Sequence, residues 1–141
     1  MSLELLVRLA GIGQLVLVAA SPFLIPRLLH WHAELALLRP LTRQIFWTYA
    51  AYILCFNLAF GLLSSFAPAL LLDRSPLAIA VSGFIAGYWV VRILVQFFYY
   101  DRSAAPPGAI YVVGEWLLVG LFTYLSLVYL IVALVDASVL G

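Results

Sequence analysis

Long stretches of apolar residues alternate with short polar segments along this chain. Four stretches, residues 3–25, 45–66, 77–100 and 109–135, approach or exceed the roughly 20 residues that cross a bilayer as a helix. The polar segments between the last three are rich in Asp, Arg, Ser, Pro and Gly, which are typical of turns. Pro68 follows the second stretch and predicts a helix end or a kink there. The pattern therefore predicts an all-α integral membrane protein, a bundle of four transmembrane helices.

Composition agrees with this fold class. Hydrophobic residues make up 67% of the chain, charged residues make up 9%, and the mean hydropathy is +1.17. Soluble domains are about half apolar and about a quarter charged. Transmembrane β-strands alternate apolar and polar residues over about ten positions, whereas the apolar runs here are continuous. The linkers are too short to hold a folded domain, so we expect residues 1–141 to form a single membrane domain.

The first stretch carries more polar residues than the others, namely Glu4, Arg8 and Gln14, and it closes on Pro22 and Pro26. A secretory signal would begin with basic residues and end at small ones. Here an acidic residue precedes the arginine, and prolines occupy the region where cleavage would occur. We therefore expect a retained helix.

The segment 27–44, between the first two stretches, mixes arginines, a tryptophan and aliphatic residues. This mixture is typical of a short helix lying in the headgroup layer. The residue before a proline avoids the helical region, so Arg39 and Pro40 are expected to break this segment. The second transmembrane helix would start just after the break.

Three residues of this interfacial segment, His30, His32 and Glu34, have side chains that can bind a metal. A metal site needs three or four converging ligands. On a helix His30 and Glu34 share a face while His32 points away, and in an extended segment all three share a face. Asp101, expected on the same side of the membrane, could add a carboxylate. Cys55 is the only cysteine, so the chain offers no cluster of thiolate ligands. We therefore expect no metal and no cofactor, and we expect His30, His32 and Glu34 to make polar contacts with lipid headgroups.

All seven basic residues are arginine, and they are distributed unevenly. The first and third connections hold four of them, and the opposite side holds two: Arg27, Arg39, Arg43 and Arg102 against Arg8 and Arg74. Basic residues favour the cytoplasm. We therefore expect a bacterial inner-membrane protein with the His30–Gln44 segment in the cytoplasm and both termini outside. If the first stretch does not span, the N-terminus would be cytoplasmic instead.

Polar residues inside the apolar stretches are costly and therefore informative; they are Gln14, Asn57, Arg92, Gln96 and Glu115. An arginine within a span costs about 2.5–3.5 kcal/mol unless it reaches the interface or pairs. Arg92 lies roughly 12 Å inward from Tyr100, and Glu115 roughly 9 Å inward from Ala109, at about 1.5 Å per residue. Because a short loop joins these two helices, they should be antiparallel neighbours. The sequence therefore predicts an ion pair between Arg92 and Glu115.

A wider polar cluster can form around this pair. Gln96 lies one turn from Arg92, and Asp101 and Arg43 are expected at the same membrane face. Such a cluster, open to the cytoplasm, would suit an anionic headgroup, a quinone carbonyl or a small carboxylate. The alternative is a buried ion pair that only fixes the packing of the last two helices.

Small residues indicate where helices can approach closely. Gly83 and Gly87 form a Gly-x-x-x-Gly pair in the third stretch, and Asn57 with Gly61 forms a similar notch in the second. These positions could serve the fold, a homo-oligomer or a larger membrane complex.

Two functions remain open from the sequence. The favoured one is a non-enzymatic accessory, assembly or scaffold subunit, because the chain lacks a motif for specific chemistry and shows no inverted repeat typical of many transporters. The alternative is a ligand-binding or catalytic membrane protein that acts on a lipid, quinone or small amphiphile through Arg92, Gln96 and Glu115. The lipid bilayer is the expected partner, and no nucleic acid is expected.

Overall fold

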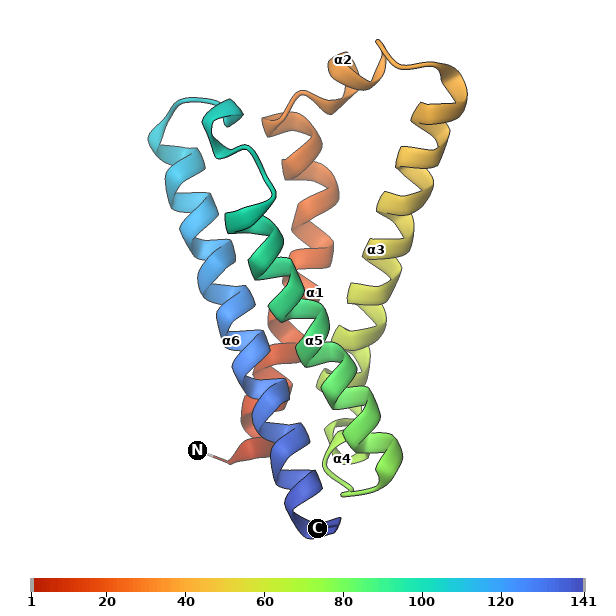
Figure 1. Ribbon diagram of the computed structural model, residues 1–141, viewed down its shortest axis with the longest axis vertical. Coiled ribbons are helices and arrows are strands. Elements are labelled where there is room, and N and C mark those ends of the chain that lie inside the picture. The colour runs from red at the N-terminus through yellow and green to blue at the C-terminus, as the bar shows by residue number, and fades with distance from the viewer. Residues whose placement is uncertain (1, 141) are drawn as a thin grey trace.

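The computed structural model describes residues 2–140, and every regular element in that range is a helix (Figure 1). The long helices are α1 (Leu3–Leu28), α3 (Pro40–Phe66), α5 (Pro76–Phe98) and α6 (Ala109–Leu140). The short ones are α2 (Trp31–Leu35), α4 (Pro68–Leu71) and the 3-10 helix η1 (Arg102–Ala104). All four long helices are long and apolar enough to cross a membrane. The predicted four-helix membrane bundle is therefore confirmed.

The helix ends differ from the predicted ones in ways that proline chemistry explains. α1 continues through Pro22 and Pro26 to Leu28; membrane helices tolerate proline because neighbouring groups satisfy the freed backbone. α3 begins at Pro40 instead of residue 45, because proline is favoured at the first position of a helix. The connection that replaces the predicted interfacial segment is therefore shorter, covering residues 29–39 with α2 at its centre.

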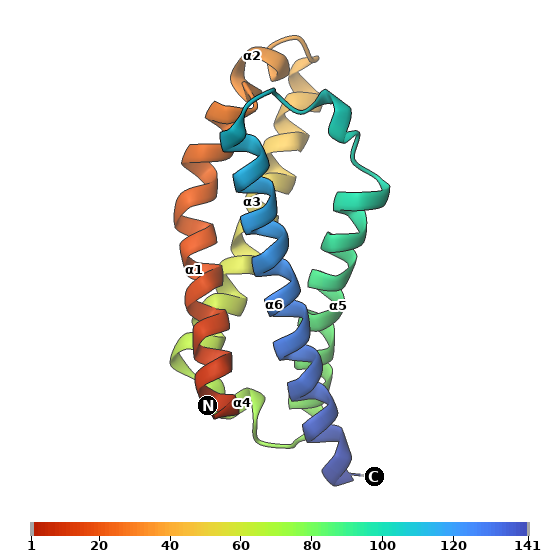
Figure 2. The ribbon, with the colours of Figure 1, turned by 90° about the vertical axis from the view of Figure 1, so that its left-hand side faces the viewer.

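The four long helices pack as two pairs, α1 with α3 and α5 with α6. α1 also packs against α6, so α6 lies between α1 and α5 (Figure 2). Both termini lie at the end of the bundle opposite α2, and toward α2 the helix α3 diverges from α5 (Figure 1). The bundle is therefore tight at one end and splayed at the other.

The α1–α3 crossing depends on glycine. A Cβ atom added at Gly11 would lie 2.6 Å from the backbone nitrogen of Ser65, and one at Gly61 would lie 2.9 Å from Cδ2 of Leu15. The predicted notch at Gly61 is thus part of a close helix contact. Gly83 and Gly87 differ, because an added Cβ at either position meets no atom within 4 Å. The close approach expected at that pair is therefore not made within the described chain.

Candidate functional site

Four buried polar side chains, one from each long helix, form a hydrogen-bonded network in the centre of the bundle. They are Gln14 of α1, Ser64 of α3, Trp89 of α5 and Tyr129 of α6, each at most 1% exposed. Nε2 of Gln14 donates to the hydroxyl of Tyr129 at 2.6 Å, and Nε1 of Trp89 donates to Oε1 of Gln14 at 3.2 Å. The hydroxyls of Ser64 and Tyr129 lie 2.5 Å apart. This network fixes the four helices relative to one another.

Sequence reasoning singled out Gln14 but gave it no partner, and it did not consider the other three residues. Tryptophan and tyrosine are frequent in the aromatic belts of membrane proteins, which hides those with an internal role. Tyr129 lies twenty residues after the start of α6, well away from the end of the bundle that holds α2. The depth of Tyr129 in the sequence was the signal that it has an internal role, because a buried phenol needs a hydrogen-bond partner.

Arg92 and Gln96 are brought together, as their spacing of one turn suggests. Nη1 of Arg92 donates to Oε1 of Gln96 at 3.2 Å. The guanidinium also lies over two aromatic rings, 5.2 Å from the centre of Tyr100 and 5.0 Å from that of Phe122. Aromatic faces attract a cation, most strongly where water is excluded. The charge of Arg92 is therefore held by an amide and two rings.

Glu115 pairs with Arg102, so the predicted Arg92–Glu115 ion pair is wrong. Nη2 of Arg102 lies 2.5 Å from Oε1 of Glu115, which is an ion-pair contact by distance although its geometry is not that of a hydrogen bond. Arg102 also lies over the ring of Phe97, 5.2 Å from its centre. The prediction rested on similar depth, opposite charge and neighbouring helices, and did not consider Arg102 of the loop as a partner of Glu115. The side chains of the pair are 42% and 22% exposed, so it contributes about 0–1 kcal/mol.

Asp101 and Arg43 are the two remaining members of the predicted polar cluster. Asp101 is exposed and accepts from the backbone N–H and the hydroxyl of Ser103. The hydroxyl first, and then the backbone N–H, lower the pKa of Asp101 below its usual value. Arg43 lies in the first turns of α3 and is partly exposed. Within residues 2–140, no hydrogen bond or ion pair joins either residue to Arg92 or Gln96.

The histidine segment does not converge on a metal. His30 has left-handed backbone angles, φ 54° and ψ 40°, and precedes α2, which carries His32 and Glu34. The ring of His32 lies 5.6 Å from that of Trp47, and all three candidate ligands are exposed. Within residues 2–140, no three His, Cys, Asp or Glu side chains are grouped so that they could hold a metal ion.

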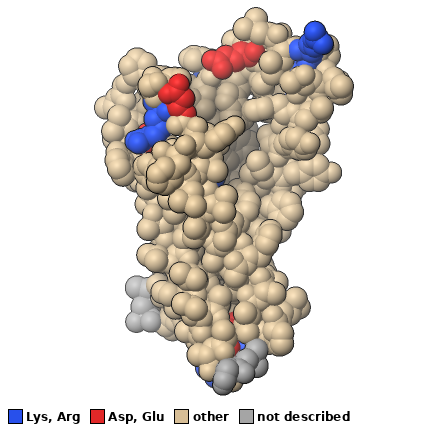
Figure 3. All heavy atoms as spheres, viewed as in Figure 1, with Lys and Arg blue, Asp and Glu red and all other residues tan. Residues whose placement is uncertain are grey.

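A cleft separates α3 from α5 at the splayed end of the bundle. Its floor is aromatic: the ring of Phe60 on α3 lies 6.1 Å from Phe84 and 5.4 Å from Tyr88, both on α5. Beyond these contacts the two helices diverge, and the molecular surface is hollowed between them (Figure 3). The cleft therefore opens toward the end that holds α2.

The cleft contains polar side chains at its floor and along one wall. Asn57 is 8% exposed, lies beside the hydroxyl of Tyr88, and its Oδ1 has no hydrogen-bond partner within the described residues. Tyr88, Arg92 and Gln96 follow at intervals of four residues and therefore share one face of α5. Tyr88 contacts Phe60 of α3, whereas the guanidinium of Arg92 lies over the ring of Phe122 on α6, so this face of α5 borders both helices. An unpaired buried amide oxygen costs about 1–3 kcal/mol, so Asn57 is a candidate ligand-binding residue.

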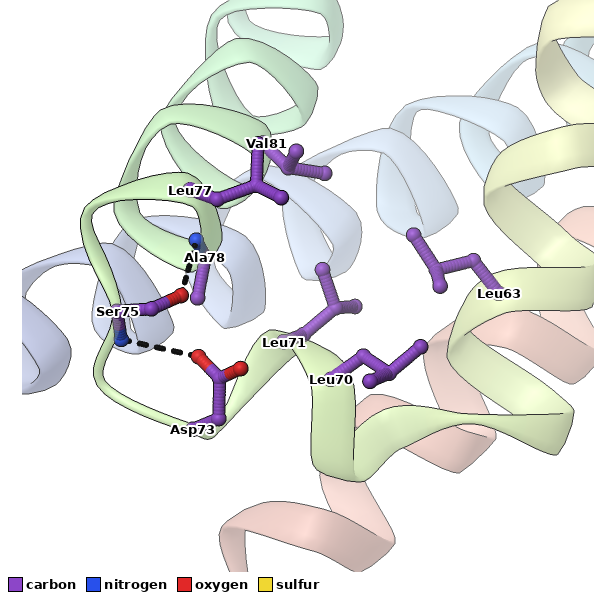
Figure 4. Close-up of a pocket in the computed structure, with 8 residues that line it drawn as sticks. All are labelled: Leu63, Leu70, Leu71, Asp73, Ser75, Leu77, Ala78 and Val81. Atoms are coloured by element: carbon purple, nitrogen blue, oxygen red, sulfur yellow. Dashed lines mark hydrogen bonds between the residues drawn. The ribbon is translucent and has the colours of Figure 1, made fainter.

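An apolar cavity lies between α3, α4 and α5 near the α4–α5 turn (Figure 4). It has a volume of about 190 Å³, and α3, α4 and α5 supply its apolar lining of Leu63, Leu70, Leu71, Leu77, Ala78 and Val81. The α4–α5 turn forms its rim, where Oδ1 of Asp73 accepts from the N–H of Ser75 at 2.9 Å. Hydrogen bonds from the side chain and then the backbone of Ser75 lower the pKa of Asp73.

Asp136 is a further buried group that sequence reasoning missed. It is 1% exposed, and its Oδ2 has no hydrogen-bond partner within the described residues. The predicted fourth helix ended at residue 135, whereas α6 continues to Leu140 and carries Asp136 inside the bundle. Asp136 lies near Asp73 and Arg74, at the end away from the cleft.

No protein-family model, no curated protein and no solved structure matches this chain.

Proposed function

We propose that this protein is a non-enzymatic membrane module that binds an amphiphile in the cleft between α3 and α5. The observation that carries the proposal is Oδ1 of Asn57, which has no hydrogen-bond partner within the described residues and lies beside Tyr88, one turn of α5 from Arg92. A bound head group that hydrogen-bonds Asn57 would satisfy this oxygen.

Arg92 supports a polar or acidic head group. A guanidinium has five N–H donors, and one of those of Arg92 binds Gln96. The others can donate to a ligand oxygen while the rings of Tyr100 and Phe122 keep the guanidinium in place. Glu115, which sequence reasoning assigned to the same pocket, is held by Arg102 and has no role in this proposal.

The proposed orientation follows from the arginines. The end of the bundle that holds α2 carries four arginines: Arg27, Arg39, Arg43 and Arg102. Because basic residues favour the cytoplasmic side, this end would face the cytoplasm of a bacterial inner membrane. Both termini would then lie outside, and the cleft would face the cytoplasmic leaflet. A reporter fused to the C-terminus should read as external, and a cytoplasmic reading would reverse this orientation.

An accessory or scaffold subunit is the second candidate, favoured by Gly83 and Gly87. Both are exposed on α5, and glycine costs about 0.8–1 kcal/mol relative to alanine inside a helix. A partner helix packed against this smooth surface would offset that cost. This role and amphiphile binding use different faces of α5.

Equilibrium binding of two probes to the detergent-purified protein tests the proposed function. Palmitate supplies an acidic head and decylubiquinone a neutral carbonyl head. We expect at least one probe to bind, and both Arg92→Gln and Asn57→Leu to weaken that probe by roughly tenfold, since a hydrogen bond to a charged group contributes about 1.5–3 kcal/mol.

Two matched substitutions outside the cleft serve as controls. Arg102→Gln removes an exposed arginine of the loop, and Cys55→Leu alters an exposed position on α3. Both should bind the probes as the parent does. Failure of both probes to bind, or equal weakening by the cleft variants and the controls, would exclude binding in the cleft.

A further inference from the structure

Asn57 lies deep within the membrane-spanning part of α3. It follows Pro40, the first residue of the helix, by seventeen residues, which is roughly 25 Å at about 1.5 Å per residue. The hydrocarbon core of a bilayer is about 30 Å thick, so a group that reaches Asn57 from the α2 end must enter the apolar interior. A charged or zwitterionic group is costly at that depth. The group that pairs with Asn57 is therefore neutral.

The hydrogen-bonding groups around Asn57 call for two oxygen atoms in the ligand. Oδ1 of Asn57 can only accept and has no partner within the described residues, whereas the guanidinium of Arg92 can only donate. Asn57 lies beside the hydroxyl of Tyr88, and Arg92 is one turn further along α5. The ligand must therefore present an O–H group to Asn57 and an acceptor oxygen to Arg92.

The side chains next to Asn57 are aromatic. Phe60, one turn along α3, contacts Phe84 and Tyr88 of α5, and the ring of Phe56 lies 6.1 Å from that of Phe60. Aromatic side chains pack favourably against the face or edge of another flat ring. These surroundings favour a ligand whose two oxygen atoms are carried by an aromatic ring over an acylglycerol or a fatty alcohol.

We infer that the ligand is a membrane quinone in its reduced, quinol form. The inference rests on the proposed function and adds the chemical class of the ligand and the oxidation state that binds. One phenolic hydroxyl donates to Oδ1 of Asn57, and the oxygen at the opposite end of the ring accepts from Arg92. The apolar tail leaves between α3 and α5, which diverge toward α2 (Figure 1).

The oxidised form fits the same groups less well. Both oxygen atoms of a quinone are carbonyl oxygens and can only accept, so a bound quinone would leave Oδ1 of Asn57 without a partner. A buried acceptor that stays unpaired weakens binding. The cleft should therefore retain the quinol in preference to the quinone, and this preference requires no electron transfer by the protein.

Equilibrium dialysis of the detergent-purified protein against decylubiquinol, kept reduced under nitrogen, and against decylubiquinone tests the inference. We expect the quinol to bind roughly tenfold more tightly, because only the quinol donates to Asn57. The dimethyl ether of decylubiquinol keeps the ring and lacks both O–H groups, so it should bind no more tightly than the quinone. These comparisons use the parent protein and do not depend on the folding of a variant.

Two substitutions in the cleft should affect the preference differently. Asn57→Leu should abolish the preference for the quinol, because the acceptor of its hydroxyl is lost. Arg92→Gln should weaken both forms alike and leave the preference unchanged, because both forms place an acceptor oxygen at Arg92. Cys55→Leu, at an exposed position of α3, should change neither affinity. Thermal unfolding in detergent shows which variants are folded.

The outcomes separate this inference from the proposed function. If the quinol and the quinone bind equally, or if the ether binds as tightly as the quinol, the inference fails while amphiphile binding stands. A preference for the quinol that persists in folded Asn57→Leu also overturns it. If palmitate binds through Arg92 and neither quinone form does, the cleft function holds and the ligand class is wrong. If no probe binds, both proposals fail.

Discussion

Gly11→Leu is expected to prevent the chain from folding into its four-helix bundle. A side chain at this position meets the backbone nitrogen of Ser65 at 2.6 Å and the carbonyl oxygen of Gly61 at 2.9 Å. Overpacking against side chains costs about 1–3 kcal/mol, and backbone atoms cannot rotate away, so the cost here should exceed that range. Size-exclusion chromatography in detergent should show aggregate in place of a single folded species.

Gly83→Leu is the matched control. An added Cβ at Gly83 meets nothing within 4 Å, so the same substitution should leave the melting temperature of the purified protein close to that of the parent. Equal losses of stability from the two substitutions would show that α1 and α3 do not cross closely at Gly11.

Gln14→Leu is expected to destabilise the folded protein by about 1–3 kcal/mol, because it leaves the indole N–H of Trp89 buried without an acceptor. The Ser64–Tyr129 contact remains, so the bundle should fold with a lower melting temperature. Adding Trp89→Phe to Gln14→Leu removes the orphaned donor. The double variant should therefore lose less stability than the two single losses added together.

Thr123→Val is the control for this prediction. The hydroxyl of Thr123 is exposed and donates to the carbonyl of Val119 in its own helix. Its loss should be close to neutral. If the stability lost by the double variant equals the sum of the losses from Gln14→Leu and Trp89→Phe, the two side chains are not coupled.

The sequence predicts the fold well because lipid leaves few alternatives to helices. The ends of α3 and α5 were misplaced by at most five residues, since apolar periodicity is weak where a helix enters the headgroup layer. Gly61 was correctly identified as a packing position. The sequence does not distinguish Gly83 and Gly87 from Gly61. Their spacing shows that the helix has a face of small residues, but it does not show whether that face packs against another helix of the bundle or lies on the outside.

The candidate site was predictable only in part. Arg92 and Gln96 come from one helix, so their spacing was enough to place them together. The partner of Glu115 depends on how the loop at Arg102 folds back, which apolar patterns do not encode. The cleft depends on the divergence of α3 from α5, and Asn57 gains significance only from its position at the floor of that cleft.

Mass spectrometry of the intact protein, purified from its own membrane in a mild detergent, tests the central claim most directly. We predict one small amphiphile bound per chain, and its loss from both Arg92→Gln and Asn57→Leu but not from Arg102→Gln. A bare chain in every sample would contradict amphiphile binding in the cleft. A bound partner protein without any small molecule would also contradict it, and would favour the scaffold role instead.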